Sequence, residues 1–376
     1  MKKSIMAISV FTALFSSAAV ANLHINGFAS IKGGLSTGSD KTLYGYTNEL
    51  DFKNESLFAI QVRSDLGERL SVTAQVMGRG SNDFDAQFEW AFLTYELSEN
   101  MRLNAGRLRT PFYRYSDFMD VGFAYDWLRV PQGVYGLGFN NVEGVSLYHT
   151  GQLGDFDSTA QLIYGSFSGD ITLAGNSASA TINDIAGVTW ELERGWLSVR
   201  AAYLSGRSTI DAPALAPLFA GLQQVGLSNV IAELDFNDDT SEFIGLGVTL
   251  DQGQWVMVSE YNRINVKQSF FAKRENYYLS LAYRLDTLTP YMSFEREDHR
   301  SKTEIYQPYT SSLPPQLLQP LIAVVESQAV DSKTWNMGVR YDFHPSAAFK
   351  MQYSNEKNTL TDSRSDVVAI GVDLVF

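Results

Sequence analysis

Residues 368–376 read VAIGVDLVF, and apolar side chains occupy every second position of this stretch. Successive residues of a β-strand point to opposite faces of the sheet. As a strand, the stretch has one face that is apolar throughout, made of Val368, Ile370, Val372, Leu374 and Phe376, and another face of mostly small or polar residues. This pattern is typical of a strand that has lipid on one side and water on the other.

The same alternation recurs upstream, most clearly over residues 335–343, 277–284 and 70–76. In a soluble β-sandwich the apolar face would form a shared core, which is the competing interpretation. Against it, the polar face is rich in small and charged residues, and aromatic residues gather at the strand ends, as in the girdles of membrane barrels. The alternation therefore favours a transmembrane antiparallel β-barrel, an all-β fold.

Short and long connections alternate along the chain. The short ones lie at 67–68, 98–100, 151–155, 194–195, 252–253, 286–288 and 344–346. The long ones lie at 37–55, 78–84, 109–141, 166–180, 206–241, 262–275, 299–332 and 355–365. Seven short and eight long connections predict sixteen strands, with short periplasmic turns and long external loops. The parity of residues 84–96 and 255–262 is ambiguous, so fourteen to eighteen strands remain open.

Composition excludes several classes of protein. The 376 residues contain no cysteine, which excludes disulfides, thiolate metal sites and cysteine catalysis. The four histidines are far apart in the sequence, which argues against a metal site, and we expect no metal and no cofactor. The net charge of −13 argues against a nucleic-acid partner, which requires a basic face.

Residues 1–21 have the pattern of a secretory signal peptide. Lys2 and Lys3 precede an apolar run, and the segment finishes with the cleavage pattern Ala19-Val20-Ala21. The run is too short for a membrane anchor, which needs about 20 apolar residues. We expect residues 22–376 to form a single β-barrel domain.

The third long connection, 109–141, is unusually aromatic for an external loop. It contains Phe112, Tyr113, Tyr115 and Trp127 together with charged residues of both signs. Exposed loops are mostly small and polar, whereas aromatic rings give a loop something to pack with against a barrel wall. We expect this loop to lie inside the barrel; packing outside, at a subunit contact, is the alternative.

With these features the chain resembles the general bacterial porins of Gram-negative outer membranes. The resemblance rests on the signal peptide, the sixteen-strand rhythm, the large third loop and the terminal segment from Asp373 to Phe376. It implies a water-filled channel in the cell outer membrane, a third loop at 109–141 that constricts the pore, and a homotrimer. It further implies contacts with outer-membrane lipid and lipopolysaccharide, with the barrel-insertion machinery through Phe376, and with small hydrophilic solutes. The constriction-loop motif of enterobacterial members is absent.

Charged residues on the loop and on the neighbouring strands form the candidate selectivity site. Arg107 has the parity of the lipid face, so it requires a bulge near Gly106 or a position above the membrane. A transverse field between an acidic loop and a basic wall would act on permeating ions, although a scattered polar lining is the plainer interpretation. The acids are Asp117, Asp120 and Asp126, and the wall bases are Lys32, Arg63, Arg79, Arg107 and Arg109.

The function predicted from these features is passive diffusion of small hydrophilic solutes and ions. A substrate-selective channel for sugars or aromatic solutes is the main alternative, because loop aromatics inside a pore could form a stacking track. A hydrolase needs a nucleophile activated by a nearby base, and the four histidines offer little for that role: two lie beside turns, one begins the first strand and one opens a loop, so we do not expect an enzyme. Two external segments, 213–230 and 314–330, have helical rather than strand spacing and are predicted to be short helices that pack on the barrel mouth or on each other.

Overall fold

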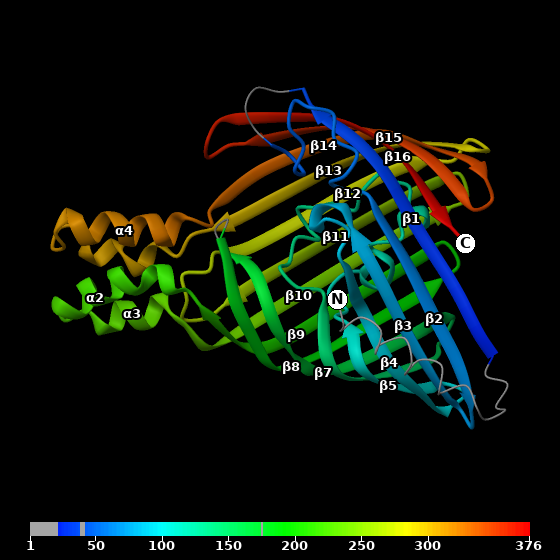
Figure 1. Cartoon of the computed structure of the whole chain (residues 1–376), viewed down its shortest axis with the longest axis horizontal. Helices are drawn as coiled ribbons and strands as arrows, with labels where there is room; N and C mark the ends of the chain where they lie inside the picture. The colour runs from blue at the N-terminus through cyan, green and yellow to red at the C-terminus, as the bar shows by residue number, and fades with distance from the viewer. Residues whose placement is uncertain (1–21, 38–41, 174–175) are drawn as a thin grey trace, which may run out of the picture.

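The structure, a computed structural model that describes residues 22–37, 42–173 and 176–376, is a closed antiparallel β-barrel. Each strand pairs with its sequence neighbours, and β1 pairs with β16 to close the sheet (Figure 1). The barrel therefore has no free edge, which satisfies the backbone hydrogen bonds within the membrane. The predicted fold class and sixteen strands are confirmed.

The strands differ in length. They are β1 (Asn22–Ser36), β2 (Leu57–Gly67), β3 (Leu70–Arg79), β4 (Ala86–Ser98), β5 (Met101–Arg109), β6 (Asn141–Leu153), β7 (Phe156–Leu173), β8 (Asn176–Arg194), β9 (Leu197–Asp211), β10 (Phe236–Gln252), β11 (Trp255–Val266), β12 (Lys273–Tyr283), β13 (Leu288–Arg300), β14 (Val330–His344), β15 (Ala347–Asn358) and β16 (Ser363–Val375). The helices lie in the long loops. They are η1 (Gly80–Asn82), η2 (Ser116–Phe118), η3 (Gly122–Ala124), η4 (Pro213–Leu215), α2 (Ala216–Gln224), α3 (Ser228–Leu234), η5 (Thr303–Ile305), η6 (Gln307–Tyr309) and α4 (Pro315–Glu326).

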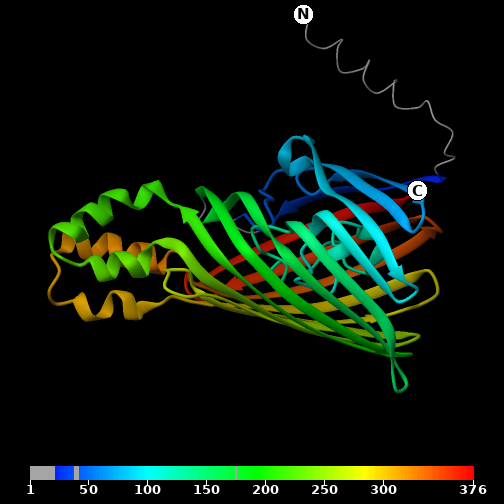
Figure 2. The ribbon, with the colours of Figure 1, turned by 90° about the horizontal axis from the view of Figure 1, so that it is seen from below.

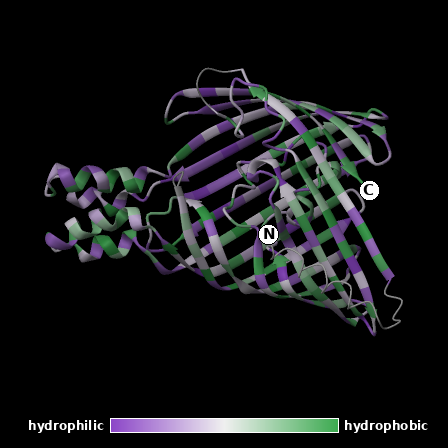
Figure 3. Ribbon diagram, in the orientation of Figure 1, coloured by the Kyte–Doolittle hydropathy of each residue, from purple (hydrophilic) through white to green (hydrophobic). Residues whose placement is uncertain are grey.

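Hydrophilic and hydrophobic residues alternate along many of the strands (Figure 3). On β14, Trp335 and Met337 are 45% and 55% exposed, whereas Asn336 between them is 2% exposed. On β16 the buried positions include Val367, Ala369 and Asp373, all with the inward parity. The predicted lipid face is thus the outer surface of the barrel.

All seven predicted short turns join consecutive strands, but the predicted long loop at 166–180 is wrong. There β7 and β8 continue as a hairpin, paired from Phe167 with Ile182 to Leu173 with Asn176. Serine and glycine are frequent in this segment, and its apolar Phe167 lies on the inner face, so the segment lacks the outward apolar face of a lipid-facing strand. Backbone pairing nevertheless continues, because the hydrogen-bond ladder does not require one apolar face.

The structure explains why apolar and polar residues do not alternate regularly on β4 and β11. On β4 the register shifts between Trp90 and Phe88, so that Glu89 is an extra residue opposite β3. Such a bulge reverses the inward and outward alternation partway along a strand. On β11 the inward face carries apolar Val256 and Val258, which are buried. Alternation by polarity therefore fails on both strands, although both cross the wall.

The predicted helices at 213–230 and 314–330 are confirmed. Helices α2, α3 and α4 bury Leu222, Leu234, Leu321 and Val325 against one another, and together they project beyond the strand ends (Figures 1 and 2). Proline at the first turn of α4 is compatible with helix initiation because that amide has no intrahelical partner. Among the described residues, none of the helices combines the length and the apolar character needed to cross a membrane.

The carboxyl-terminal residue lies in the seam where the barrel closes. The backbone of Phe376 both accepts from and donates to Gly27, at 2.8 and 2.9 Å. Its ring stacks on Phe58 at 5.8 Å between centroids. The proposed signal peptide, residues 1–21, lies outside the described residues.

Candidate functional site

Residues 110–140, between β5 and β6, contact the inward-facing side chains of strands far around the barrel. Arg200 on β9 donates to the carbonyl of Phe112 at 3.1 Å, and Asn262 on β11 donates to the carbonyl of Val134 at 2.8 Å. On β12, Ser280 accepts from Trp127 Nε1 at 2.7 Å. The segment is thus held by polar contacts to the side of the wall opposite β2–β7.

Lys350 on β15 is the most enclosed of these anchors. Its fully buried ammonium donates to the carbonyls of Gly122, Tyr125 and Trp127 at 2.6, 2.6 and 2.7 Å. It also pairs with Asp373 at 3.0 Å. A Cβ on Gly122 would lie 2.2 Å from Asp373 Oδ1, so the close approach of the loop requires glycine here. Lys350 was not among the residues predicted from the sequence; an inward-facing lysine in a strand is a weak signal.

The predicted loop aromatics form a packed cluster. Phe112, Tyr113 and Trp127 are at most 5% exposed, and Tyr115 packs edge-on against Trp127 at 5.5 Å. Their rings contact each other and the wall residues Phe243 and Tyr278. Phe112, Tyr113 and Trp127 are buried and Tyr115 is half-buried, so these aromatics pack the loop against the wall rather than offering an open stacking track for solutes.

The opposite edge of the loop meets the wall in a cluster of four charges, which we call the ion cluster: Arg79, Glu89, Arg109 and Asp120. Asp120 accepts from Arg109 Nη2 at 2.7 Å and from Arg79 Nη2 at 3.1 Å. Glu89 pairs with Arg79 and lies 3.5 Å from Arg109. Burial opposes the charge of Asp120, but Arg109 and Arg79 outweigh it and lower its pKa. Asp120 is therefore ionised at neutral pH.

The ion cluster joins the expected loop acid to two expected wall bases, but it does so by direct contact rather than across an open gap. Sequence reasoning missed Glu89, the second acid. The bulge on β4 turns this side chain inward next to Trp90, so counting alternate positions assigns it to the wrong face. The sequence did contain one indication of the inward position of Glu89: it lies between Phe88 and Trp90 in a strand whose apolar and polar residues do not alternate regularly.

Two separate cavities border the ion cluster, one on each side. The larger, about 980 Å³, lies on the long-loop side and borders Arg79, Glu89 and Asp120. The smaller, about 330 Å³, lies on the short-turn side and borders Arg109 and Asp117. Both follow the wall formed by β2–β7. Residues 110–140 are thus anchored to one side of the wall, and both cavities lie along the other side.

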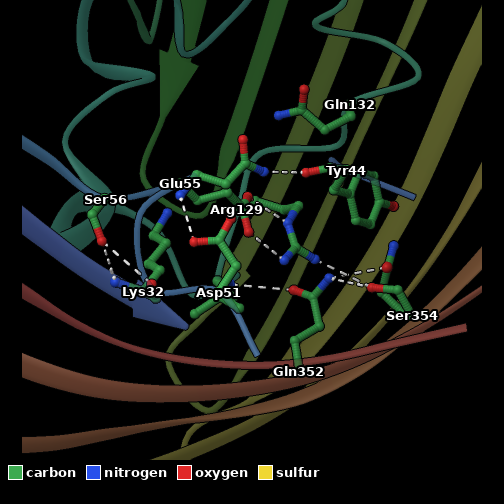
Figure 4. Close-up of polar contacts among 12 residues, drawn as sticks. Lys32, Tyr44, Asp51, Glu55, Ser56, Arg129, Gln132, Gln352 and Ser354 are labelled. Carbon is green, nitrogen blue, oxygen red and sulfur yellow. Dashed lines mark hydrogen bonds and ion pairs between the residues drawn. The ribbon is translucent and has the colours of Figure 1, made fainter. Parts of the chain in front are cut away.

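A buried ion pair borders the larger cavity (Figure 4). Arg129 donates from Nε and Nη2 to the two oxygens of Glu55 at 2.7 and 2.6 Å, and its guanidinium lies 4.3 Å from the ring centre of Tyr44. Burial raises the pKa of Glu55, but the charge and hydrogen bonds of Arg129 dominate and lower it to about 2. The pair ties loop residues 43–56 to the 110–140 segment, and neither partner was among the predicted site residues.

The other predicted site residues are dispersed. Burial raises the pKa of Asp117 and of Asp126, against the opposing effects of Arg109 and Arg340 respectively. Asp117 borders the smaller cavity, whereas Asp126 borders neither. Lys32 borders the larger cavity and is 5% exposed, and Arg63 borders the smaller.

Arg107 does not join the ion cluster. Its guanidinium pairs with Glu143, which shares the parity of the exposed Val145, and its Nε donates to the carbonyl of Phe88 at 3.0 Å. Gly106 has φ +139°, a conformation that favours glycine, but pairing with β4 continues without interruption through this residue. The β4–β5 ladder therefore has no bulge at Gly106, and Arg107 pairs with Glu143 and borders the larger cavity.

Within the described part of the chain, no group of three or more histidine, aspartate or glutamate side chains is placed to hold a metal ion. The charged residues of the site bind each other and backbone carbonyls.

A sequence profile of the Gram-negative porin family matches residues 7–362. No curated protein sequence matches the chain. Several solved structures share the fold at low identity. The outer membrane channel DcaP of Acinetobacter baumannii is 12% identical with a TM-score of 0.63, covering 96% of this chain and 99% of its own. The anion-selective porin from Comamonas acidovorans is 12% identical with a TM-score of 0.58, covering 95% and 100%. OmpT of Vibrio cholerae in its trimer form is 13% identical with a TM-score of 0.54, covering 95% and 99%.

Proposed function

We propose that this chain, which belongs to the Gram-negative porin family and lies in the bacterial outer membrane, allows passive diffusion of small hydrophilic solutes and ions. One observation carries the proposal: two polar cavities lie along β2–β7 and border the ion cluster from its two sides, while the loop is anchored to the opposite wall. A channel needs a polar route across the barrel, and a hydrolase would need an activated nucleophile instead. We therefore assign a channel rather than an enzyme.

In this proposal residues 110–140 are the inward-folded constriction loop, and the ion cluster is its narrowest charged point. The fixed charges in a narrow passage act on a permeating ion more strongly than the same charges in open water. Because two arginines face two acids there, the local charge is balanced, so we expect weak selectivity between cations and anions.

We also propose that residues 1–21 are removed on export and that the mature barrels form a homotrimer. The trimer form of the similarly folded OmpT supports this assembly. Lipid contacts with the exposed apolar belt, and recognition of Phe376 by the insertion machinery, belong to the same proposal.

Planar-bilayer recording of the purified protein tests diffusion and assembly together. Diffusion predicts stepwise current increases whose conductance grows in proportion to salt concentration, and a trimer predicts closure in three equal steps. Liposome swelling with sugars of increasing size then measures the cutoff. Absence of current from protein with the heat-modifiable mobility of a folded barrel would overturn the proposal, whereas saturating uptake of one sugar class would favour a substrate-selective channel.

A further inference from the structure

The inner wall is apolar in one region, unlike the polar lining along β2–β7. Side chains with inward parity near the long-loop ends of β8–β11 include Ile182, Leu204, Phe243 and Ile264. Phe112 and residues 136–139 of the loop cover them. They enclose a cavity of about 300 Å³, which we call the side cavity. An apolar cavity of this size holds water poorly and suits a small organic ligand.

The side cavity adjoins the large cavity of the proposed diffusion route. Gly138, Phe139 and Asp170 border both. A solute that enters from the long-loop side therefore reaches the side cavity without passing the ion cluster. This location separates binding in the side cavity from passage through the channel.

One cation, Arg274 on β12, borders the side cavity. Its guanidinium lies 4.2 Å from the ring centre of Phe271, and its Nη2 donates to Gln328 at 3.1 Å. Its Nε is buried and donates to no acceptor. A buried donor without an acceptor costs free energy, and the Nε edge of a guanidinium matches a carboxylate. The geometry therefore favours a ligand that brings an anionic oxygen to Arg274.

The acidic residues around Arg274 limit the negative charge that the side cavity can accommodate. Glu297, whose charge acts on Arg274, accepts from Ser332 at 3.4 Å and lies 3.8 Å from His299, but forms no ion pair with Arg274. Asp170 and Glu242 border the cavity as well, the latter paired with Lys267 at 3.0 Å. One arginine among these acids accommodates one negative charge better than two.

We propose that the side cavity binds small amphipathic monocarboxylates, with the apolar group among Phe243, Ile182 and Ile264 and the carboxylate on Arg274. This inference goes beyond diffusion and does not rest on it, because the ligand is held beside the proposed route. The two parts of the ligand are recognised by different features, apolar enclosure and a free donor, so they can be tested separately.

The probe is 4-phenylbutyrate, and its neutral counterpart is 4-phenylbutan-1-ol. Calorimetric titration of the full-length mature protein in lipid nanodiscs, with empty nanodiscs subtracted for partitioning, measures binding without current. We expect saturable binding of one 4-phenylbutyrate per chain, and binding of the alcohol weaker by about tenfold or more, the value of a hydrogen bond to a charged group.

Three variants complete the test. Arg274→Gln is expected to weaken 4-phenylbutyrate binding about tenfold or more, and Ile182→Trp, which fills the cavity, to abolish it. Arg364→Gln, which changes an exposed arginine on β16, is the matched control and is expected to bind as the unaltered chain does. Each variant is first shown to be folded by heat-modifiable mobility. Equal binding of acid and alcohol, unchanged binding by folded Ile182→Trp, or no saturable binding would each overturn the proposal.

Discussion

Neutralising Asp120 tests the role of the ion cluster most directly. Asp120 is 15% exposed at its side chain and holds both Arg79 and Arg109. The four side chains of the cluster sum to zero charge when all are ionised. Asp120→Asn keeps the size of the side chain and leaves the cluster with a net charge of +1. The expected result is a shift of ion preference toward anions.

The magnitude follows from Coulomb's law. An ion that passes about 6 Å from one uncompensated charge in water gains or loses about 0.7 kcal/mol. Cations are disfavoured and anions favoured by this amount, so the ratio of their permeabilities changes by about 1.4 kcal/mol, or roughly tenfold. Screening in about 0.1 M salt, where the Debye length is about 10 Å, reduces the change to about threefold to fourfold. We therefore expect a threefold to tenfold shift, larger in dilute salt.

The assay is the zero-current potential of the variant in a planar bilayer under a salt gradient. Asp126→Asn is the matched control, because this acid belongs to the same loop but borders neither cavity of the route. It is expected to leave the permeability ratio near that of the unaltered chain. An unchanged ratio in Asp120→Asn with normal single-channel conductance would refute the assignment, and so would an equal shift in the control.

Three further predictions concern the loop, its pH response and assembly. Lys350→Met removes the ammonium that holds three loop carbonyls, contacts of about 1.5–3 kcal/mol each, so open-channel current noise is expected to increase. The raised pKa of Asp117 means that this carboxylate loses its charge at a higher pH than an ordinary aspartate, so lowering the pH from 7 toward 4 is expected to shift preference toward anions, and Asp117→Asn to reduce that shift. Deleting Phe376 removes its pairing with Gly27 and its stacking, so the yield of heat-modifiable, membrane-inserted protein is expected to fall.

Matched variants separate these effects from general damage. Lys333→Met changes an exposed strand lysine and should leave current noise unaltered. Phe343→Ala removes another exposed aromatic, 49% exposed, and should reduce insertion less than loss of Phe376. Each prediction has an outcome that would contradict it. For Lys350→Met it is unchanged open-channel current noise, for Asp117→Asn an unchanged pH response, and for deletion of Phe376 full membrane insertion.

The sequence determined the barrel and its strand count. Trp335, Met337 and their alternate neighbours face an apolar medium, while Asn336 faces a polar interior. The order of apolar and polar residues along each strand is enough to predict this arrangement. The helices at 216–224 and 315–326 were predictable for the same reason, since their apolar spacing is local. Where the local pattern was absent, as in the hairpin of β7 and β8, the prediction failed although the backbone pairing persisted.

The tertiary structure decided which charges meet. Asp120 and Arg79 are 41 residues apart, and Lys350 lies 228 residues from Gly122, so no local spacing joins them. The bulge that turns Glu89 inward depends on pairing with β3, which parity along β4 alone does not encode. The alternation of apolar and polar residues shows which face of a strand a residue occupies. Which side chains touch across the barrel depends instead on how the closed sheet and residues 110–140 are arranged in space. Fold was therefore predictable from local order, whereas the ion cluster and the side cavity arose from long-range geometry.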